Sequence, residues 1–240
     1  MKFFLAIILS TSAVFSTFAQ AQISMQKPIL NLFELSIKSD KTDLYKTIAQ
    51  SNITESLDKE SGTLAMYSFN RKDSPNQTYM IEIYQSDTAY HQHLKSKTYK
   101  EFIQKAPDIL NKKIKIETEP QFLGDKKIIQ NEKIINNLVI VDVKPEFKQV
   151  FKNIVIPEMI ESLRVEEGVL AMYATIDTNN NNRWYFYEIY ASEAAYLKHR
   201  ETMHFKTYIA ESAKMTTWKE SISVVPNFLR NKGKLKFEKK

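Results

Sequence analysis

A long internal repeat constrains the fold of this chain more than any other feature of its sequence. Residues from about Ile29 to Leu123 align without a gap to residues 106 positions further on, and about a third of the paired positions are identical. The strongest matches are Gly62-x-Leu64-Ala65-Met66-Tyr67 with Gly168-x-Leu170-Ala171-Met172-Tyr173, and Glu82-Ile83-Tyr84 with Glu188-Ile189-Tyr190. A solenoid needs three or more short units. A single long-period duplication therefore indicates two copies of one small domain in tandem.

Each copy contains the same succession of hydrophobic patterns. Strand-like runs cover 28–38 and 135–144, and apolar residues at helical spacing follow each of them. Gly62 and Gly168 then open hairpins, 63–69 with 78–84 and 169–176 with 184–190. A second helix begins after Ser86 or Ser192, each a favourable N-cap, and a closing strand follows. This order of elements predicts an α+β fold made of two ferredoxin-like βαββαβ units.

The repeat also predicts the domain boundaries. We expect a first domain over 28–123, a linker over 124–134, a second domain over 135–230 and a Lys-rich tail over 231–240. The hairpin strands are apolar on both faces, because Trp184, Phe186 and Tyr190 point one way while Tyr185, Tyr187 and Ile189 point the other. Helices cover only one face of such a sheet, so the second face needs another partner. We expect the two sheets to pack against each other as an intramolecular pseudo-dimer with a barrel-like interior.

The first 21 residues have the pattern of a secretory signal peptide. Lys2 supplies a positive charge, an apolar run follows, and Ala19-Gln20-Ala21 gives a small-x-small cleavage pattern. We expect cleavage after Ala21 and a periplasmic or secreted protein; an uncleaved anchor is the alternative. No later segment reaches the roughly 20 apolar residues of a membrane span. The sequence has no cysteine, which excludes disulfides, thiolate metal sites and a cysteine nucleophile.

The positive charge of the chain is modest. Without Lys2 the formal net charge of +6 becomes +5, and five lysines fall in the last nine residues. A nucleic-acid-binding face would combine basic residues with interleaved aromatics, whereas the aromatics here lie within strand-like runs. We therefore expect no nucleic-acid partner and interpret the terminal lysines as a solvated tail.

The strand end Glu-x-Tyr, followed by Ser-x-x-Ala-x-x-x-His on the next helix, resembles the antibiotic biosynthesis monooxygenase superfamily. The pattern occurs in both copies, with His93 and His199 as its last residues. It is closest to the quinol-monooxygenase-like branch of these dimeric α/β barrels. Members usually carry one unit and form homodimers, so the resemblance implies a fused pair. It also implies that a base deprotonates a phenol or hydroquinone, whose anion reduces O2 without a cofactor.

The haem-degrading branch of that superfamily is a poor match. It needs an Asn on the first strand, and a Trp and a His on the second helix. The Trp position falls at His93 and His199, and the His position at Ile103 and Ile209. The chain also has only four glycines and no G-x-G-x-x-G or P-loop pattern. We therefore expect no cofactor.

Four polar residues are the catalytic candidates. His93 and His199 are equivalent, and an imidazole that titrates near neutral pH is a suitable general base. Glu82 and Glu188 lie among apolar strand residues, so each carboxylate needs a partner or a proton. If they line the barrel interior, they could accept a phenolic proton. The alternatives are a surface or interface histidine and a structural carboxylate. We expect no metal site, because His199 and His204 are five residues apart.

Four aromatic residues are the candidates for binding a substrate, namely Tyr84, Tyr190, Trp184 and Phe186. Thr78 and Met80 stand in the first copy where Trp184 and Phe186 stand in the second. We therefore expect a planar ligand to prefer the second copy; the alternative is that Trp184 fills the core.

Two classes of function remain open. The first is a cofactor-independent monooxygenase acting on a quinol or other phenolic small molecule. The second is an exported, non-catalytic barrel that binds an apolar ligand or a protein partner.

Overall fold

The computed structural model describes residues 27–240. The expected signal peptide lies outside the described residues. The first repeat contains β1 (Ile29–Ile37), α1 (Thr42–Lys59), β2 (Thr63–Arg71), β3 (Gln77–Tyr84), α2 (Asp87–Lys95), α3 (Lys97–Ile109), β4 (Leu110–Ile116) and β5 (Thr118–Asp125). The second contains β6 (Ile135–Val143), α4 (Lys148–Val165), β7 (Val169–Asp177), β8 (Arg183–Tyr190), α5 (Glu193–Glu201), α6 (Met203–Ser212), β9 (Thr216–Asn231) and β10 (Lys236–Glu238). The α+β class and the tandem ferredoxin-like layout are confirmed.

The helical stretch after each hairpin is a pair of helices, not the single helix that the sequence predicts. Ser96 separates α2 from α3, and Thr202 separates α5 from α6; both have extended backbone. The side chain of each accepts a hydrogen bond from the backbone three residues on, so each is the N-cap of a new helix. The second helix of each pair therefore takes a new direction.

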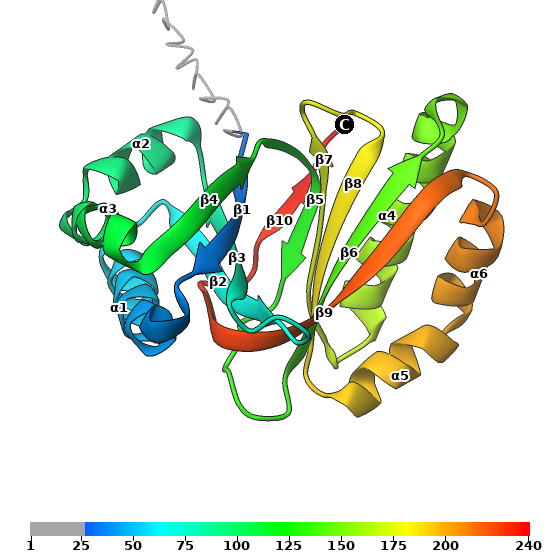
Figure 1. Ribbon diagram of the computed structural model, residues 1–240. Coiled ribbons are helices and arrows are strands. Elements are labelled where there is room, and N and C mark those ends of the chain that lie inside the picture. The colour runs from blue at the N-terminus through cyan, green and yellow to red at the C-terminus, as the bar shows by residue number, and fades with distance from the viewer. Residues whose placement is uncertain (1–26) are drawn as a thin grey trace, which may run out of the picture.

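The closing strands join the two repeats. The first half of β9 pairs with β6, and its second half pairs with β2 of the first repeat. In the same way β4 pairs with β1, whereas β5 pairs with β7 of the second repeat. All ten strands thus belong to one antiparallel sheet, in the order β10-β5-β7-β8-β6-β9-β2-β3-β1-β4. Figure 1 shows the two halves facing each other, with helices on the outside of both.

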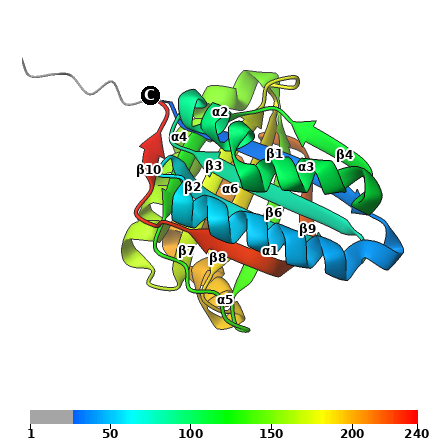
Figure 2. The same ribbon diagram turned by 90° about the vertical axis from the view of Figure 1, so that its left-hand side faces the viewer.

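The expected two-sided packing of the hairpins is confirmed. A core cluster between the halves draws side chains from both repeats, among them Tyr67, Ile81, Tyr173 and Tyr187. Tyr67 and Tyr173 are equivalent residues whose hydroxyl groups lie 2.8 Å apart, and the Tyr173 hydroxyl donates to Asp125 at 2.7 Å. Two further clusters lie beneath the helices, one in each repeat. Figure 2 shows α1 and α3 lying across the outer face of the first sheet. The chain is an intramolecular pseudo-dimer.

The Lys-rich segment 231–240 differs from the expected solvated tail. It turns at Gly233 and Lys234, both with positive φ, and then forms β10, which pairs with β5. The ammonium of Lys239 pairs with Glu119 at the start of β5. A strand at the edge of a sheet presents unpaired backbone groups, and β10 covers part of that edge. Within residues 27–240, no helix is long and apolar enough to cross a membrane.

Candidate functional site

The candidate carboxylates lie beneath the helices and not in the interior between the sheets. Side chains alternate along a strand, so the residues on either side of Glu82 in β3, Ile81 and Ile83, face the other repeat, while Glu82 faces α1 and α2. One of its oxygens accepts a hydrogen bond from the Tyr84 hydroxyl at 2.9 Å. Glu188 and Tyr190 make the same contact at 2.9 Å. Each repeat therefore has its own pair of a glutamate and a tyrosine between its sheet and its helices.

The equivalent histidines are buried, so neither is a surface residue. Nδ1 of His93 lies 2.9 Å from a carboxylate oxygen of Glu60, and Nδ1 of His199 lies 3.0 Å from one of Glu166. Burial raises the pKa of Glu60, but hydrogen bonds, chiefly from His93, outweigh it and lower that pKa overall. Neither glutamate was predicted from the sequence. Their signal was the repeat itself, because each stands two residues before the glycine that opens the hairpin.

A cavity of about 280 Å³ opens between the sheet and the helices of the first repeat. Its polar lining comes from Asn52 of α1, Glu82 of β3, and Lys113 and Lys115 of β4. The remaining lining residues are apolar or aromatic: Phe33, Leu35, Tyr45, Ala49, Met80, Tyr90, Tyr99 and Phe102. The Lys113 ammonium lies 5.0 Å from the centre of the Phe33 ring, and that of Lys115 lies 5.1 Å from the Tyr90 ring. The cavity thus combines aromatic walls with one carboxylate and two cations.

Three buried polar atoms in α1 and α2 of the first repeat have no hydrogen-bond partner within residues 27–240. They are Oδ1 of Asn52, Oγ of Ser56 and Nε2 of His93. Asn52 lines the cavity, while the His93 ring lies behind Tyr99, with ring centres 5.2 Å apart. A buried polar atom without a partner is costly. Of these three residues, Asn52 lines the cavity, so its side-chain amide lies beside the space that a ligand would occupy.

The equivalent space in the second repeat is filled by aromatic side chains. Trp184 stacks on Phe186, with ring centres 5.7 Å apart, and Phe151 of α4 meets Trp184 edge-on at 5.4 Å. All three are buried. Neither Trp184 nor Phe186, both predicted to bind a substrate, lines the 280 Å³ cavity. Tyr84 is not among its lining residues either, and it reaches the site through its hydrogen bond to Glu82.

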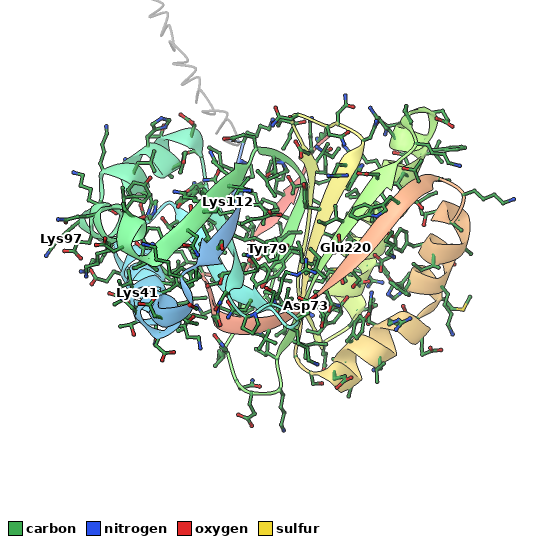
Figure 3. The ribbon with its side chains drawn as sticks, viewed as in Figure 1. Lys41, Asp73, Tyr79, Lys97, Lys112 and Glu220 are labelled. Carbon is green, nitrogen blue, oxygen red and sulfur yellow. The ribbon has the colours of Figure 1, made fainter. Side chains whose placement is uncertain are left out.

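A second cavity lies between the repeats and has a different character. It measures about 510 Å³ and is lined by Arg71, Asp73, Tyr79 and Glu220, among others. Figure 3 labels Asp73, Tyr79 and Glu220 in this region between the two halves. Arg71 pairs with Asp73 at 3.0 Å and lies 3.7 Å from Glu220. These charges satisfy one another, and the lining offers less aromatic surface than the first cavity.

The second repeat also has a cluster of potential metal ligands, although no metal site was expected. The cluster consists of Glu158, His199 and His204. Each offers one potential ligand atom, and these three atoms all lie within 4.8 Å of one another. The expectation of no metal site assumed that His199 and His204 lie on one continuous helix. They belong to α5 and α6 instead, and the break at Thr202 turns His204 back toward His199.

Comparison with known proteins agrees with this architecture. The family model for antibiotic biosynthesis monooxygenase matches residues 28–105 and 135–211, one segment in each repeat. A candidate monooxygenase from Lactobacillus acidophilus NCFM is 27% identical and superimposes with a TM-score of 0.85 over 89% of this chain and 100% of its own. A candidate monooxygenase from Fusobacterium nucleatum is 30% identical, with a TM-score of 0.84 over 89% of this chain and 99% of its own.

More distant structures share the fold alone. An anthrone oxidase-like protein is 12% identical, with a TM-score of 0.55 over 87% of this chain and 95% of its own. No protein with a curated functional description matches the sequence.

Proposed function

The chain belongs to the antibiotic biosynthesis monooxygenase family, and from that premise we propose that it oxidises a small, flat phenol or hydroquinone with O2 in the cavity of the first repeat. The observation that carries the proposal is the lining of that cavity, where aromatic walls surround a single carboxylate, Glu82, and two lysines. Flat aromatic rings stack favourably on such walls, and a phenolic hydroxyl suits the carboxylate.

The size of the cavity limits the substrate. An apolar cavity of about 150 Å³ accommodates benzene, so a cavity of about 280 Å³ suits a molecule of one or two fused rings. Larger polycyclic phenols would require the helices to move apart.

In the proposed reaction Glu82 accepts the phenolic proton. The Tyr84 hydroxyl occupies only one of its oxygens, and a carboxylate can accept several hydrogen bonds. Lys113 and Lys115 stabilise the negative charge that then develops on the substrate. Asn52 lines the same cavity and contacts a second hydroxyl of the substrate. These groups orient and deprotonate the substrate, and the apolar walls limit access of water.

The electrons come from the substrate, and O2 is the oxidant. For a naphthohydroquinone, one oxygen atom of O2 bonds to a ring carbon, which gives up its hydrogen, and the other leaves as water. The hydroquinone becomes a hydroxylated quinone, so atoms and electrons balance without a further reductant. The His93–Glu60 pair positions the helices around the cavity in this scheme and does not touch the substrate.

Oxygen uptake with a panel of benzo- and naphthohydroquinones tests the proposal. Removing a general base typically costs about 10²–10⁴-fold in rate, so we expect Glu82→Gln to lose at least about a hundredfold in kcat/KM. Glu188→Gln is the matched control, because it makes the same change at the equivalent position of the filled repeat. We expect it to change the rate less than about twofold.

The alternative, a non-catalytic binding module, has a distinct outcome in the same experiment. Wild-type protein that binds the panel compounds but consumes no O2 above the autoxidation rate would overturn the oxygenase proposal. Export is a separate part of the proposal, supported by the N-terminal sequence pattern. Mass spectrometry of protein from the producing cell should then find Gln22 as the first residue.

A further inference from the structure

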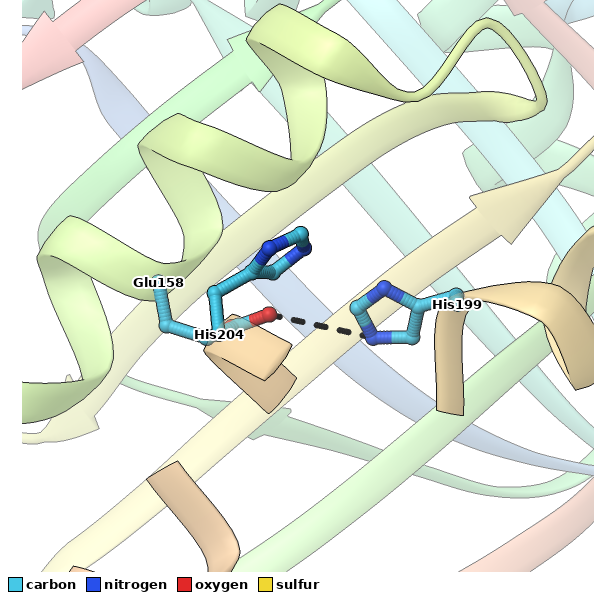
Figure 4. Close-up of side chains that lie close together, drawn as sticks. All are labelled: Glu158, His199 and His204. Carbon is cyan, nitrogen blue, oxygen red and sulfur yellow. Dashed lines mark ion pairs between the residues drawn. The ribbon is translucent and has the colours of Figure 1, made fainter. Parts of the chain in front are cut away.

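The side chains of Glu158, His199 and His204 converge between α4, α5 and α6 of the second repeat (Figure 4). Nε2 of His199 lies 3.8 Å from Oε1 of Glu158, which is too long for a hydrogen bond. Glu158 and His199 are buried, and the side chain of His204 keeps 20% of its surface exposed. The cluster is therefore enclosed on the protein side and reachable from solvent along one edge.

Glu166 fixes the orientation of both imidazole rings. One of its oxygens lies 3.0 Å from Nδ1 of His199 and 2.7 Å from Nε2 of His204. If Nδ1 of His199 donates to this carboxylate, its Nε2 carries a free lone pair that faces Glu158. A carboxylate that holds the second nitrogen of a ligating histidine is the usual support of a protein metal site.

The local charge favours a cation. The ion-pair partner of Glu158 within residues 27–240 is His199, which is charged only when protonated. Two further carboxylates, those of Glu188 and Glu166, lie close enough to Glu158 to repel its negative charge. Ser162 donates to Glu158 at 2.7 Å and satisfies one lone pair without supplying charge. A buried carboxyl group surrounded by other carboxylates gains from a bound cation.

The first repeat lacks this arrangement although the rest of its framework is the same. Asn52 stands in the position of Glu158, and Thr98 in that of His204. The histidine and the supporting glutamate are present in both repeats, as His93 with Glu60 and His199 with Glu166. Two substitutions thus distinguish the second repeat, and both add a metal-ligating side chain.

We propose that the second repeat binds one divalent transition-metal ion through Glu158, His199 and His204. Two imidazoles and one carboxylate are a ligand set that suits Zn²⁺ and Fe²⁺, whereas Mg²⁺ and Ca²⁺ prefer oxygen ligands. Ligands about 2.0–2.2 Å from a tetrahedral ion lie roughly 3.3–3.6 Å apart, so small side-chain rotations from the observed spacing close the site. The remaining coordination position is left to water.

Zn²⁺ binding to the full-length mature chain tests the proposal, with protein purified without a histidine tag. After treatment with a chelator and dialysis against buffered Zn²⁺, we expect one zinc per chain by atomic spectrometry. At a free Zn²⁺ concentration of a hundred times Kd, the melting temperature should rise by roughly 5–10 °C. A millimolar excess of Mg²⁺ should not displace the zinc.

The repeats supply the variants. Glu158→Asn and His204→Thr introduce the residues of the first repeat, and each should abolish stoichiometric binding; Glu158→Gln is the near-isosteric version if Glu158→Asn folds poorly. Glu166→Gln should weaken binding by about 10–100-fold. His91→Gln is the control, because His91 is an exposed histidine of the first repeat. Failure of the wild type to retain zinc at micromolar free concentration, or equal retention by His204→Thr and wild type, would overturn the proposal.

Discussion

The two repeats should respond in opposite ways when a single residue is exchanged between them. Met80 lines the cavity of the first repeat, and Phe186 fills the equivalent space in the second. Met80→Phe places a larger side chain beside an open volume, so it should be neutral or stabilise by about 0.5–1 kcal/mol, as cavity-filling changes commonly do. Phe186→Met leaves a smaller side chain in a packed space and removes aromatic contacts worth about 0.5–1.5 kcal/mol, so it should destabilise by about 1–2 kcal/mol.

Urea unfolding and calorimetry measure both changes. For a folded region of this size, each kcal/mol shifts the melting temperature by about 2–4 °C, so Phe186→Met should lower it by roughly 2–8 °C. Met80→Phe should leave it unchanged or raise it. The reasoning would be refuted if Met80→Phe destabilised by about 1–3 kcal/mol, the usual cost of overpacking, because the first repeat would then have no open cavity.

Three further predictions follow from particular contacts. Met80→Phe should weaken binding of a naphthohydroquinone at least tenfold in calorimetric titration, whereas equal affinity for wild type and variant would separate the ligand site from this cavity. Gly62→Ala would place a Cβ atom 2.4 Å from the Cβ of Ala89, so it should destabilise the protein by about 1–3 kcal/mol. In urea unfolding, the double variant Gly62→Ala with Ala89→Gly should recover much of the lost stability. Strictly additive effects of the two single changes would contradict this prediction. Hydrogen bonds from Lys239 and Lys27 lower the pKa of Glu119 to about 2 from 4.5; the stability that this carboxylate contributes is therefore present above pH 4.5 and lost as the pH falls toward 2. Between pH 5 and pH 3, the free energy of urea unfolding should fall less for Glu119→Gln than for wild type. Equal decreases in the two proteins would show that Glu119 contributes no such stability.

The repeat and the alternation of side chains were enough to predict the fold. A 106-residue offset with hairpins apolar on both faces indicates two units that share an interior, and the structure confirms this packing. The exchange of β5 and β9 between the repeats was not predicted, because strand pairing between distant segments leaves no periodic signal in either segment. The strand at 236–238 was missed because lysines there resemble a solvated tail.

The candidate site was predicted less completely. The repeated Glu82 and His93 were identified, but Glu60 lies in a loop where no hydrophobic period draws attention to it. The prediction that a planar ligand prefers the second copy rested on the aromatic character of Trp184 and Phe186. Whether such rings border a cavity or fill it depends on the facing helix, where Phe151 packs against both of them. That information lies in tertiary packing and not in the strand itself.

A crystal structure of the protein with a bound naphthohydroquinone analogue tests the central claim most directly. The account predicts ligand density in the first repeat only, between Phe33, Tyr90 and Phe102, with one hydroxyl within hydrogen-bonding distance of Glu82. Density in the second repeat beside Trp184, or in the interior between the sheets, would contradict it.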